Sequence, residues 1–345
     1  MADRHDSQRP ALGAPHDNAS VAARLGGEPF ELPARGLAFA GYRASPGTGV
    51  PGAAEAHSPA APRTAAPGVG AHGTGAHGAA EARPGAALPV LLVHGWPEFA
   101  AGWEATAREL LAAGYEVAAY DQRGYSPGAR PDDVRAYDVA ELVADMAAVA
   151  QGLGWERFHL VGHDWGGIVG WAFAAVHPER LASFTSAASA HPEAHGRRMA
   201  EDPDQRRRME YMRRIRRDPA GMREALLDDD GALLRSYYQG AVPAALVDSY
   251  VERLSEPGAM DAVLSYYRQF GEGAPIAYRP ITVPALYLWG SRDAAFTRGA
   301  AELTADYVEG PYRFVELTGA THWLPEEKPD EIAAAVLDWA SRHPD

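Results

Sequence analysis

The sequence predicts an α/β fold in which helices flank a mostly parallel central sheet and a helical cap is inserted after the sixth strand. Strand-like and helix-like runs alternate through 88–194 and again after residue 272, which is typical of parallel sheets with helices on both faces. The run at 88–93 is continuously apolar, as expected of a strand buried on both faces. Residues 195–272 show only helical patterns, so we expect them to cover the carboxyl ends of the strands, where ligands bind.

Six strands are expected before this insertion. The first two are short runs on either side of a glycine-containing turn within 30–44. The other four strands are expected at 88–95, 115–121, 158–162 and 181–187, with helices at 103–113, 139–153 and 167–176. After the insertion we expect strands at 284–290 and 312–317 and helices at 300–307 and 330–341.

These elements form one domain interrupted by its cap. The core is expected at 28–194 and 273–345, with the cap at 195–272. Residues 1–27 are polar and lack periodicity, and 47–87 consist mostly of Ala, Gly and Pro without Leu, Ile, Phe, Tyr or Trp. Neither segment can bury enough apolar surface to offset chain entropy, so both are predicted to be disordered.

The composition excludes several classes of function. The chain has 46 acidic and 32 basic residues, a net charge of −14, which argues against binding nucleic acid or an anionic membrane. It has no cysteine, which excludes disulfides, thiolate metal sites and cysteine nucleophiles. With neither a signal-peptide pattern nor about 18 consecutive apolar residues, we expect a cytoplasmic protein acting on a small molecule. The sequence implies no metal or organic cofactor and leaves the oligomeric state open.

The sharpest motif is Gly162-His163-Asp164-Trp165-Gly166, which lies between a predicted strand and a predicted helix. Glycines two residues before and after a central residue at such a turn are typical of a nucleophile elbow, which exposes the central side chain. Here that residue is Asp164. The alternative interpretation is a turn in which the aspartate only caps the next helix.

Three further residues follow strand ends in a matching order. Trp96 lies in His94-Gly95-Trp96-Pro97 after an early strand, Asp293 follows the strand at 284–290, and His322 follows the last strand. Nucleophile, acid and histidine in this chain order are typical of α/β hydrolases.

An aspartate at the elbow suits one kind of chemistry. Its carboxylate is ionised near neutral pH and can attack a saturated carbon, which forms an ester between enzyme and substrate. His322, oriented by Asp293, would activate water to hydrolyse that ester, and the backbone N–H groups of Trp96 and Trp165 would hold the oxyanion. Epoxides and alkyl halides are the substrates that fit.

Several segments resemble the epoxide hydrolases of the α/β-hydrolase fold. They are HGWPE at 94–98, DQRGYS at 121–126, VGHDWGG at 161–167, LWGSRD at 288–293 and GATHWLPEEKP at 319–329. The resemblance extends from about residue 30 to the C-terminus, apart from the low-complexity insert. It implies hydrolysis of an epoxide to a vicinal diol, with Asp164 as nucleophile, His322 as general base and Asp293 as orienting acid. Trp96 and Trp165 are implied as oxyanion donors.

The resemblance also implies two tyrosines in the cap that protonate the epoxide oxygen. One such tyrosine lies in a WYR segment of the family, and Ser265-Tyr266-Tyr267-Arg268 is similar to it with Tyr266 in place of the Trp, which favours Tyr267. Tyr211 is our choice for the second, and the rivals are Tyr237 and Tyr238.

The main alternative is a haloalkane or haloacid dehalogenase that uses the same Asp-His-Asp set. Haloalkane dehalogenases typically carry Asn where Trp96 stands, and haloacetate dehalogenases carry Arg where Trp165 stands. Both departures favour an epoxide. A catalytically silent binding module is the remaining alternative.

Three weaker signals have structural interpretations. His191 is expected to be a structural residue where the chain enters the cap, and His163 is expected to pack locally, away from the nucleophile. The arginines of the first cap helices are expected to form a solvated face, with attraction of anionic ligands as the alternative. These arginines are Arg206, Arg207, Arg208, Arg213, Arg214, Arg216 and Arg217.

Overall fold

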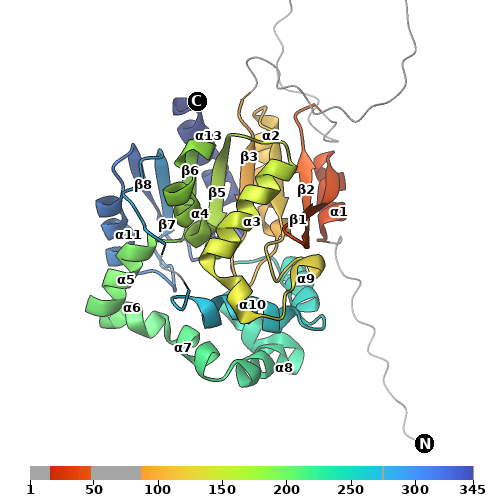
Figure 1. Cartoon of the computed structure of the whole chain (residues 1–345), viewed down its shortest axis with the longest axis vertical. Coiled ribbons are helices and arrows are strands. Elements are labelled where there is room, and N and C mark those ends of the chain that lie inside the picture. Colours follow the sequence, from red (N-terminus) through yellow and green to blue (C-terminus); the bar gives the residue numbers. More distant parts are fainter. Residues whose placement is uncertain (1–15, 48–86, 274–275, 345) are drawn as a thin grey trace, which may run out of the picture.

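A single eight-stranded sheet forms the centre of the computed structural model, which describes residues 16–47, 87–273 and 276–344 (Figure 1). The strand order is β1-β2-β4-β3-β5-β6-β7-β8; β2 pairs antiparallel with β1 and β4, and all other pairs are parallel. The strands are β1 (Glu28–Ala34), β2 (Leu37–Ala44), β3 (Val90–Val93), β4 (Val117–Tyr120), β5 (Phe158–His163), β6 (Leu181–Ala187), β7 (Ala285–Gly290) and β8 (Tyr312–Leu317). The predicted fold class is confirmed.

Helices cover both faces of this sheet. In Figure 1, α3 (Val139–Gly152) and α4 (Trp165–Val176) lie on the near face, while α2 (Glu104–Ala112) and α13 (Pro329–Arg342) lie behind it. Every residue of the central strands β3, β5, β6 and β7 is buried. This burial explains why those strands read as continuous apolar runs rather than as alternating ones.

The helical insertion between β6 and β7 comprises α5 to α10. Its helices are α5 (Pro192–Glu201), α6 (Pro203–Arg208), α7 (Glu210–Arg217), α8 (Pro219–Tyr237), α9 (Ala244–Leu254) and α10 (Ala259–Gln269). The insertion begins slightly before the predicted residue 195, because the His191 side chain accepts the backbone N–H of Glu193 and caps α5. Figure 1 shows these helices gathered at one end of the sheet.

The prediction of a disordered tail through residue 27 is wrong for its last part, because Asn18–Leu25 forms helix α1. Val21, Ala22 and Leu25 are fully buried, and Asn18 donates a hydrogen bond to the buried Asp121 carboxylate (2.7 Å). Tertiary contacts therefore hold a helix that is too short to be stable alone. Residues 1–15 of the predicted tail and 48–86 of the predicted insert lie outside the described residues.

Two helices differ in detail from the prediction. The helix predicted at 300–307 begins earlier, as α11 (Arg298–Leu303), and its second half is a 3₁₀ turn at 304–307. Helix α8 is kinked at 228–231. Within the described ranges, no helix combines the length and the apolar character needed to cross a membrane.

Buried polar contacts fix the insertion to the core. Arg253 on α9 donates to the fully buried Asp121 carboxylate (2.6 Å), and the Tyr266 hydroxyl on α10 donates to the carbonyl of Arg123 (2.6 Å). A buried charge is tolerated only when it is paired, so these contacts favour one position of α9 and α10 over the core. The side chains that α10 presents to the sheet edge are therefore held in place.

Candidate active site

The turn between β5 and α4 brings Asp164 to the carboxyl edge of the sheet. Its backbone lies at φ 47°, in the left-handed region that non-glycine residues avoid. A Cβ on Gly162 would lie 2.3 Å from the carbonyl oxygen of Gly166, and one on Gly166 would lie 2.2 Å from that of Val93. Only glycine fits either position. The Asp164 side chain makes no capping hydrogen bond to α4, so the helix-cap interpretation is wrong.

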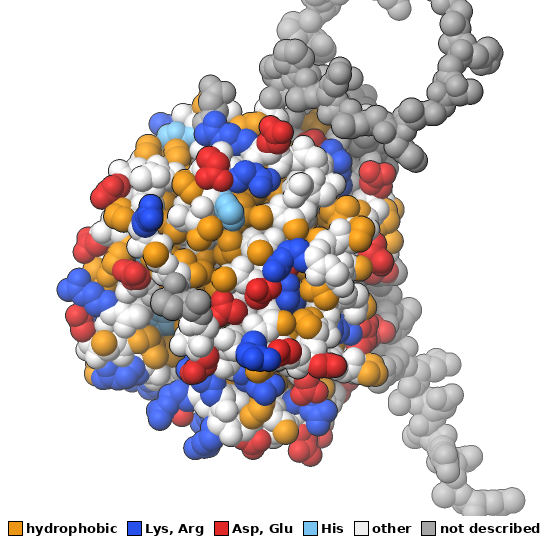
Figure 2. All heavy atoms as spheres, viewed as in Figure 1, with side chains coloured by type: hydrophobic (Ala, Val, Ile, Leu, Met, Phe, Trp, Pro, Cys, Tyr) orange, Lys and Arg blue, Asp and Glu red, His pale blue; other side chains and the backbone are white. Residues whose placement is uncertain are grey.

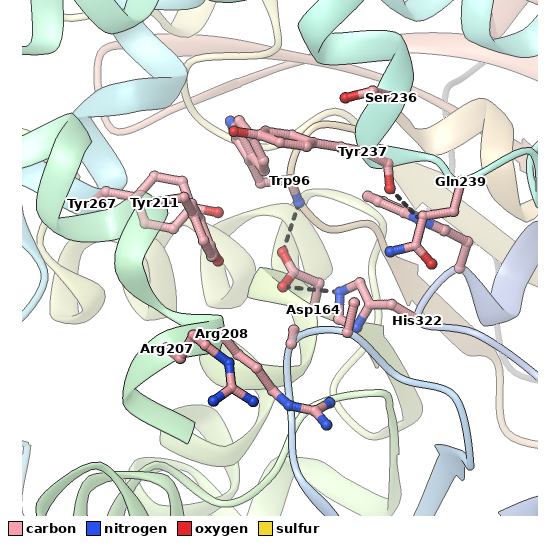
Figure 3. A pocket seen from close by; sticks show the side chains of 13 residues that line it. Trp96, Asp164, Arg207, Arg208, Tyr211, Ser236, Tyr237, Gln239, Tyr267 and His322 are labelled. Carbon is pink, nitrogen blue, oxygen red and sulfur yellow. Dashed lines mark hydrogen bonds and ion pairs between the residues drawn. The ribbon is translucent and has the colours of Figure 1, made fainter. Parts of the chain in front are cut away.

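The Asp164 carboxylate is held by two groups (Figure 3). Its Oδ1 accepts the backbone N–H of Trp96 (2.8 Å), and its Oδ2 lies 3.4 Å from Nε2 of His322. The N–H of Trp165, the other predicted oxyanion donor, forms no hydrogen bond with this carboxylate. Burial alone would raise the pKa of Asp164, but the His322 ring and the Trp96 N–H outweigh it and lower that pKa. The carboxylate is therefore ionised.

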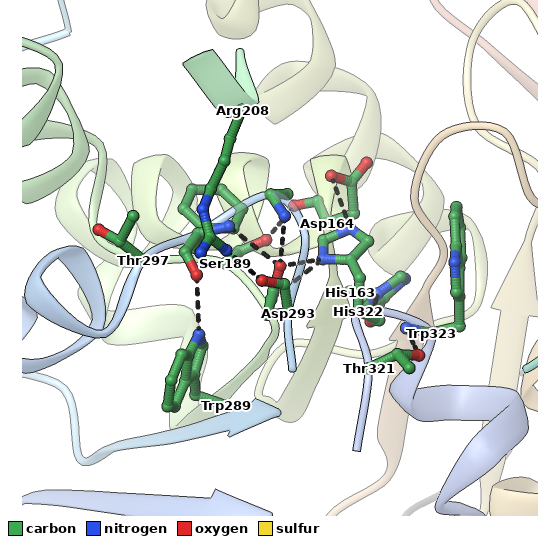
Figure 4. A network of polar contacts seen from close by, with 12 residues as sticks. His163, Asp164, Ser189, Arg208, Trp289, Asp293, Thr297, Thr321, His322 and Trp323 are labelled. Atoms are coloured by element: carbon green, nitrogen blue, oxygen red, sulfur yellow. Dashed lines mark hydrogen bonds and ion pairs between the residues drawn. The ribbon is translucent and has the colours of Figure 1, made fainter. Parts of the chain in front are cut away.

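His322 lies between two carboxylates (Figure 4). Its Nδ1 is 3.1 Å from Oδ2 of Asp293, on the side opposite to Asp164. Burial lowers the pKa of His322, but the charges and hydrogen bonds of Asp293 and Asp164 raise it by a larger amount. The net effect is a pKa well above 6.5. The structure thus brings together the three side chains that follow β5, β7 and β8.

His163 has a larger role than the local packing we expected. One ring nitrogen lies 2.8 Å from the Glu98 carboxylate, and the other lies 2.8 Å from the backbone carbonyl of His322. Glu98 also accepts the backbone N–H of Gly95 (3.1 Å). His163 therefore connects the loop after β3 to the loop that carries His322. Sequence reasoning missed this connection, although Glu98 belongs to the HGWPE segment.

A second buried carboxyl lies beside Glu98. Glu326 accepts a hydrogen bond from the Tyr250 hydroxyl (3.1 Å). Burial, and then the neighbouring Glu98 carboxylate, raise the pKa of Glu326 well above 4.5. Glu326 therefore holds its proton at pH values where an exposed glutamate is ionised.

A cavity of about 320 Å³ opens above Asp164 and His322. Rings from the core and the insertion make up much of its wall (Figure 3). It is lined by Trp96, Asp164, Arg207, Arg208, Tyr211, Ser236, Tyr237, Gln239, Tyr267, Ala294, Ala295, His322 and Trp323.

Tyr267 and Tyr211 lie together in this cavity, on α10 and α7. Their ring centres are 5.4 Å apart, and each ring also contacts Trp96. Burial, followed by nearby groups that include the Asp164 carboxylate, raises both tyrosine pKa values above 10. The two hydroxyls also interact with each other, which raises the pKa of Tyr267 and partly offsets the rise for Tyr211. The buried Tyr267 hydroxyl has no backbone or carboxylate partner among the described residues. Both phenols are therefore protonated.

The two rival tyrosines differ from Tyr211. Tyr237 lines the cavity and is half-buried like Tyr211, but its ring contacts are with Trp96 and Tyr211. The charge of Asp164 does not contribute to the raised pKa of Tyr237. The hydroxyl of Tyr238 donates to the carbonyl of Pro97 (2.7 Å), and its side chain does not line the cavity. The geometry therefore favours Tyr211 as the partner of Tyr267.

The arginines of α6 and α7 do not form the fully solvated face that we predicted. Arg207 and Arg208 line the cavity, and Arg208 donates a hydrogen bond to the backbone carbonyl of Asp293. Arg216 donates to the carbonyl of Tyr267 (2.8 Å) and so connects α7 to α10. Within the described ranges, no group of three or more His, Asp or Glu side chains is placed to hold a metal ion.

The fold and this site define an α/β hydrolase with a carboxylate at its elbow. The family model described as the alpha/beta hydrolase fold matches residues 89–329. Epoxide hydrolase A of Mycobacterium tuberculosis is 32% identical over 301 residues, which cover 74% of this chain and 91% of that protein. The chain therefore belongs to the epoxide hydrolase family of the α/β-hydrolase fold.

Two further comparisons agree with this family. Epoxide hydrolase 4 of Mus musculus is 30% identical over 262 residues, which cover 73% of this chain and 72% of that protein. The crystal structure of a mutant epoxide hydrolase from Bacillus megaterium, complexed with its naphthyloxy-propanediol product, is 26% identical with a TM-score of 0.67. That match covers 74% of this chain and 93% of the other.

Proposed function

We propose that the protein hydrolyses an epoxide to a vicinal diol through a covalent ester on Asp164. The observation that carries the proposal is the position of the Asp164 carboxylate between the Trp96 N–H and the His322 ring. Two protonated phenols, Tyr267 and Tyr211, line the same cavity. The insertion supplies both phenols, so it acts as a cap that completes the site.

Ring opening uses the ionised carboxylate and a phenol. Oδ2 of Asp164 attacks an epoxide carbon, and the carbon–oxygen bond of the ring breaks. The oxygen that leaves takes a proton from Tyr267, assisted by Tyr211, because an unprotonated alkoxide is a poor leaving group. Oδ1, which already accepts the Trp96 N–H, becomes the carbonyl oxygen of the ester.

Ester hydrolysis uses His322 and Asp293. His322 removes a proton from water as the water attacks Cγ of Asp164, and the Trp96 N–H stabilises the negative charge that develops on Oδ1, with the Trp165 N–H as second donor. The bond from Cγ to the alkyl oxygen then breaks, and that oxygen takes the proton from His322 to give the diol. The second proton of the water leaves the re-formed Asp164 carboxyl and restores the phenol.

The charge on His322 changes between these steps. In the free protein, Asp164 contributes a charge and a hydrogen bond that raise the pKa of His322. Both effects disappear once Asp164 is an ester, so the pKa of His322 falls, the ring releases its proton to solvent and the neutral ring can act as the base. The first step thereby prepares the second. The ring regains a proton from solvent when the Asp164 carboxylate re-forms.

Dehalogenation uses the same Asp-His-Asp set and remains the alternative to separate by experiment. A halide leaves without a proton, so the two phenols in the cavity favour the epoxide. Diol formation from a panel of epoxides is expected, with little halide release from haloalkanes. The reverse result would assign the dehalogenase reaction, and neither product would indicate a binding module.

The covalent step is tested with a His322→Gln variant. On mixing with an epoxide, its intact mass should rise by the mass of one substrate, and peptide mapping should place the addition on Asp164. His159→Gln is a matched control, because His159 is a buried histidine that contacts Ser183 away from the cavity. A His322→Gln protein that stays unmodified while the wild type forms diol would contradict the ester mechanism.

A further inference from the structure

Two cationic side chains contribute to the wall of a cavity that also holds several Trp and Tyr rings. Arg207 and Arg208, at the end of α6, both line it, together with the catalytic charges of Asp164 and His322. Figure 3 shows the two arginines on the side of Asp164 that faces away from Trp96 and Tyr237. The epoxide chemistry described above gives neither guanidinium a role.

The two guanidinium groups differ in how many of their N–H donors already have a partner. Arg208 is half-buried, donates to the backbone carbonyl of Asp293 and pairs with Asp204, so it fixes the loop that carries the triad acid. Arg207 contacts only the other oxygen of Asp204, and its side chain is 77% exposed. In the described part of the chain, its Nε and Nη1 have no hydrogen-bond partner. Arg207 therefore keeps donors for a ligand at the cavity mouth.

The segment that carries Arg207 and Arg208 has a charge opposite to that of the molecule. Residues 202–218 hold seven arginines and four acidic residues, whereas the whole chain has a net charge of −14. Figure 2 shows blue side chains gathered at the lower left, where Figure 1 places α6 and α7. A locally positive segment on a negative protein favours anions on this side of the molecule, and of its seven arginines Arg207 and Arg208 are those that line the cavity.

We propose that the preferred substrate is an epoxide that carries a carboxylate, which Arg207 binds at the mouth while the epoxide ring reaches Asp164. The inference rests on the proposed epoxide hydrolysis and adds its substrate class. A guanidinium is suited to the task because its planar donors match the two oxygens of a carboxylate. The aromatic wall formed by Trp96, Tyr211 and Tyr237 takes the apolar body of the substrate.

The test compares a terminal epoxide that carries a carboxylate on three to six methylene groups with its primary amide, which has nearly the same shape and no charge. The wild type should hydrolyse the carboxylate with a kcat/KM at least about 10-fold higher, mainly through KM. Arg207→Gln should reduce this ratio about 10-fold, and Arg207→Lys should restore part of it. Added salt should also reduce the ratio, because the contact is exposed.

Arg213→Gln is the matched control. Arg213 is an equally exposed arginine on α7 that pairs with Glu210 and does not line the cavity, so its loss should leave the ratio unchanged. A ratio near one in the wild type, or an equal fall in both variants, would overturn the proposal. If the amide is converted to its diol and the carboxylate is not, the proposed preference for a carboxylate is overturned, whereas the proposed epoxide hydrolysis is supported.

Binding provides a readout that does not depend on turnover. By calorimetry, 4-phenylbutanoate should bind the wild-type protein about 10-fold more tightly than 4-phenylbutanamide, and Arg207→Gln should remove the difference. Equal affinities of the wild type for these two compounds would contradict the anion site even if no epoxide were hydrolysed.

Discussion

The phenol of Tyr267 is the strongest acid candidate at the scale of single residues, because its buried hydroxyl interacts with the Tyr211 hydroxyl and has no backbone or carboxylate partner among the described residues. Replacing Tyr267 with Phe should slow formation of the alkyl-enzyme by about 100-fold, since a positioned general acid contributes at least that much. Stopped-flow mixing with an epoxide, under conditions that resolve the first step, measures this rate.

Tyr312→Phe is the matched control for that change. Tyr312 has a buried hydroxyl without a partner in the described residues, but it lies at the amino end of β8, away from the cavity. An unchanged rate of ring opening in Tyr267→Phe would remove this phenol from the mechanism. Parallel measurements on Tyr211→Phe and Tyr237→Phe should show the larger loss for Tyr211, whose pKa Asp164 affects.

Glu326 gives the protein a pH-dependent stability. Because its folded pKa is raised above the ordinary 4.5, the folded state keeps a proton that the unfolded state loses. The stabilisation is therefore complete below about pH 4.5 and is lost as the pH rises toward the folded pKa. Glu326→Gln keeps an acceptor for Tyr250 and does not titrate, so its free energy of unfolding should exceed that of the wild type by on the order of 1 kcal/mol at pH 8.

Denaturant unfolding at several pH values measures this difference. The gain should grow between pH 5 and pH 8, whereas Glu252→Gln, on the exposed side of α9, should show no such trend. A Glu326→Gln protein that is less stable at pH 8 would mean that Glu326 is ionised in the folded state.

Sequence alone was enough to locate the residues that follow strand ends. Asp164, Asp293 and His322 each lie directly after a parallel strand, and the ends of parallel strands meet at one edge. The contacts of Arg208 and His163 join segments far apart in the chain, which no local pattern encodes. Tyr211 was predictable only in part: the sequence predicted that it lies on a helix of the cap, but not which way its side chain points.

At the scale of elements, the elbow between β5 and α4 depends on close backbone contact. Gly166→Ala should lower the free energy of unfolding by about 2 kcal/mol or more, because its Cβ would lie 2.2 Å from the Val93 carbonyl oxygen. Activity should fall with it, since the displaced turn carries Asp164. Thermal unfolding and initial rates measure the two effects.

Gly196→Ala is the opposite case on α5. Its Cβ would meet no atom within 4 Å, so the substitution should stabilise the protein by about 0.5–1 kcal/mol through helix propensity. If both substitutions have equal effects, the close contact at the elbow does not control stability.

The predictability of elements did not follow burial alone. Fully buried β6 and half-buried β8 both have the predicted bounds, whereas fully buried β3 and β4 are shorter than predicted. Helix α1 was missed because its eight residues gain stability from Asp121 and from the core rather than from their own pattern. The kink in α8 depends on left-handed residues at 229–231, which a run of helix formers conceals.

At the scale of the whole molecule, the low-complexity segment joins two points that lie close together. Ala44, at the end of β2, and Val90, at the start of β3, both pair with Val117, one on each side of β4. Neighbouring strands lie about 4.8 Å apart, so the connection spans roughly 10 Å. Joining Gly47 to Ala87 through two glycines leaves enough chain for that distance.

We expect this shortened protein to fold and to keep its kcat/KM within about twofold, because both ends of the connection lie at the opposite end of the sheet from the cavity. The shorter loop costs less closure entropy, which should raise the free energy of unfolding by about 1–2 kcal/mol. A folded but inactive protein would instead assign this segment a role in catalysis.

The position of that connection also offers a way to attach the enzyme to a solid support. The natural chain has no cysteine, so one cysteine placed in the shortened connection would be its sole thiol. Coupling through this thiol would fix every molecule by the amino ends of β3 and β4. The arginine-lined mouth, at the other end of the strands, would then face the flowing substrate solution.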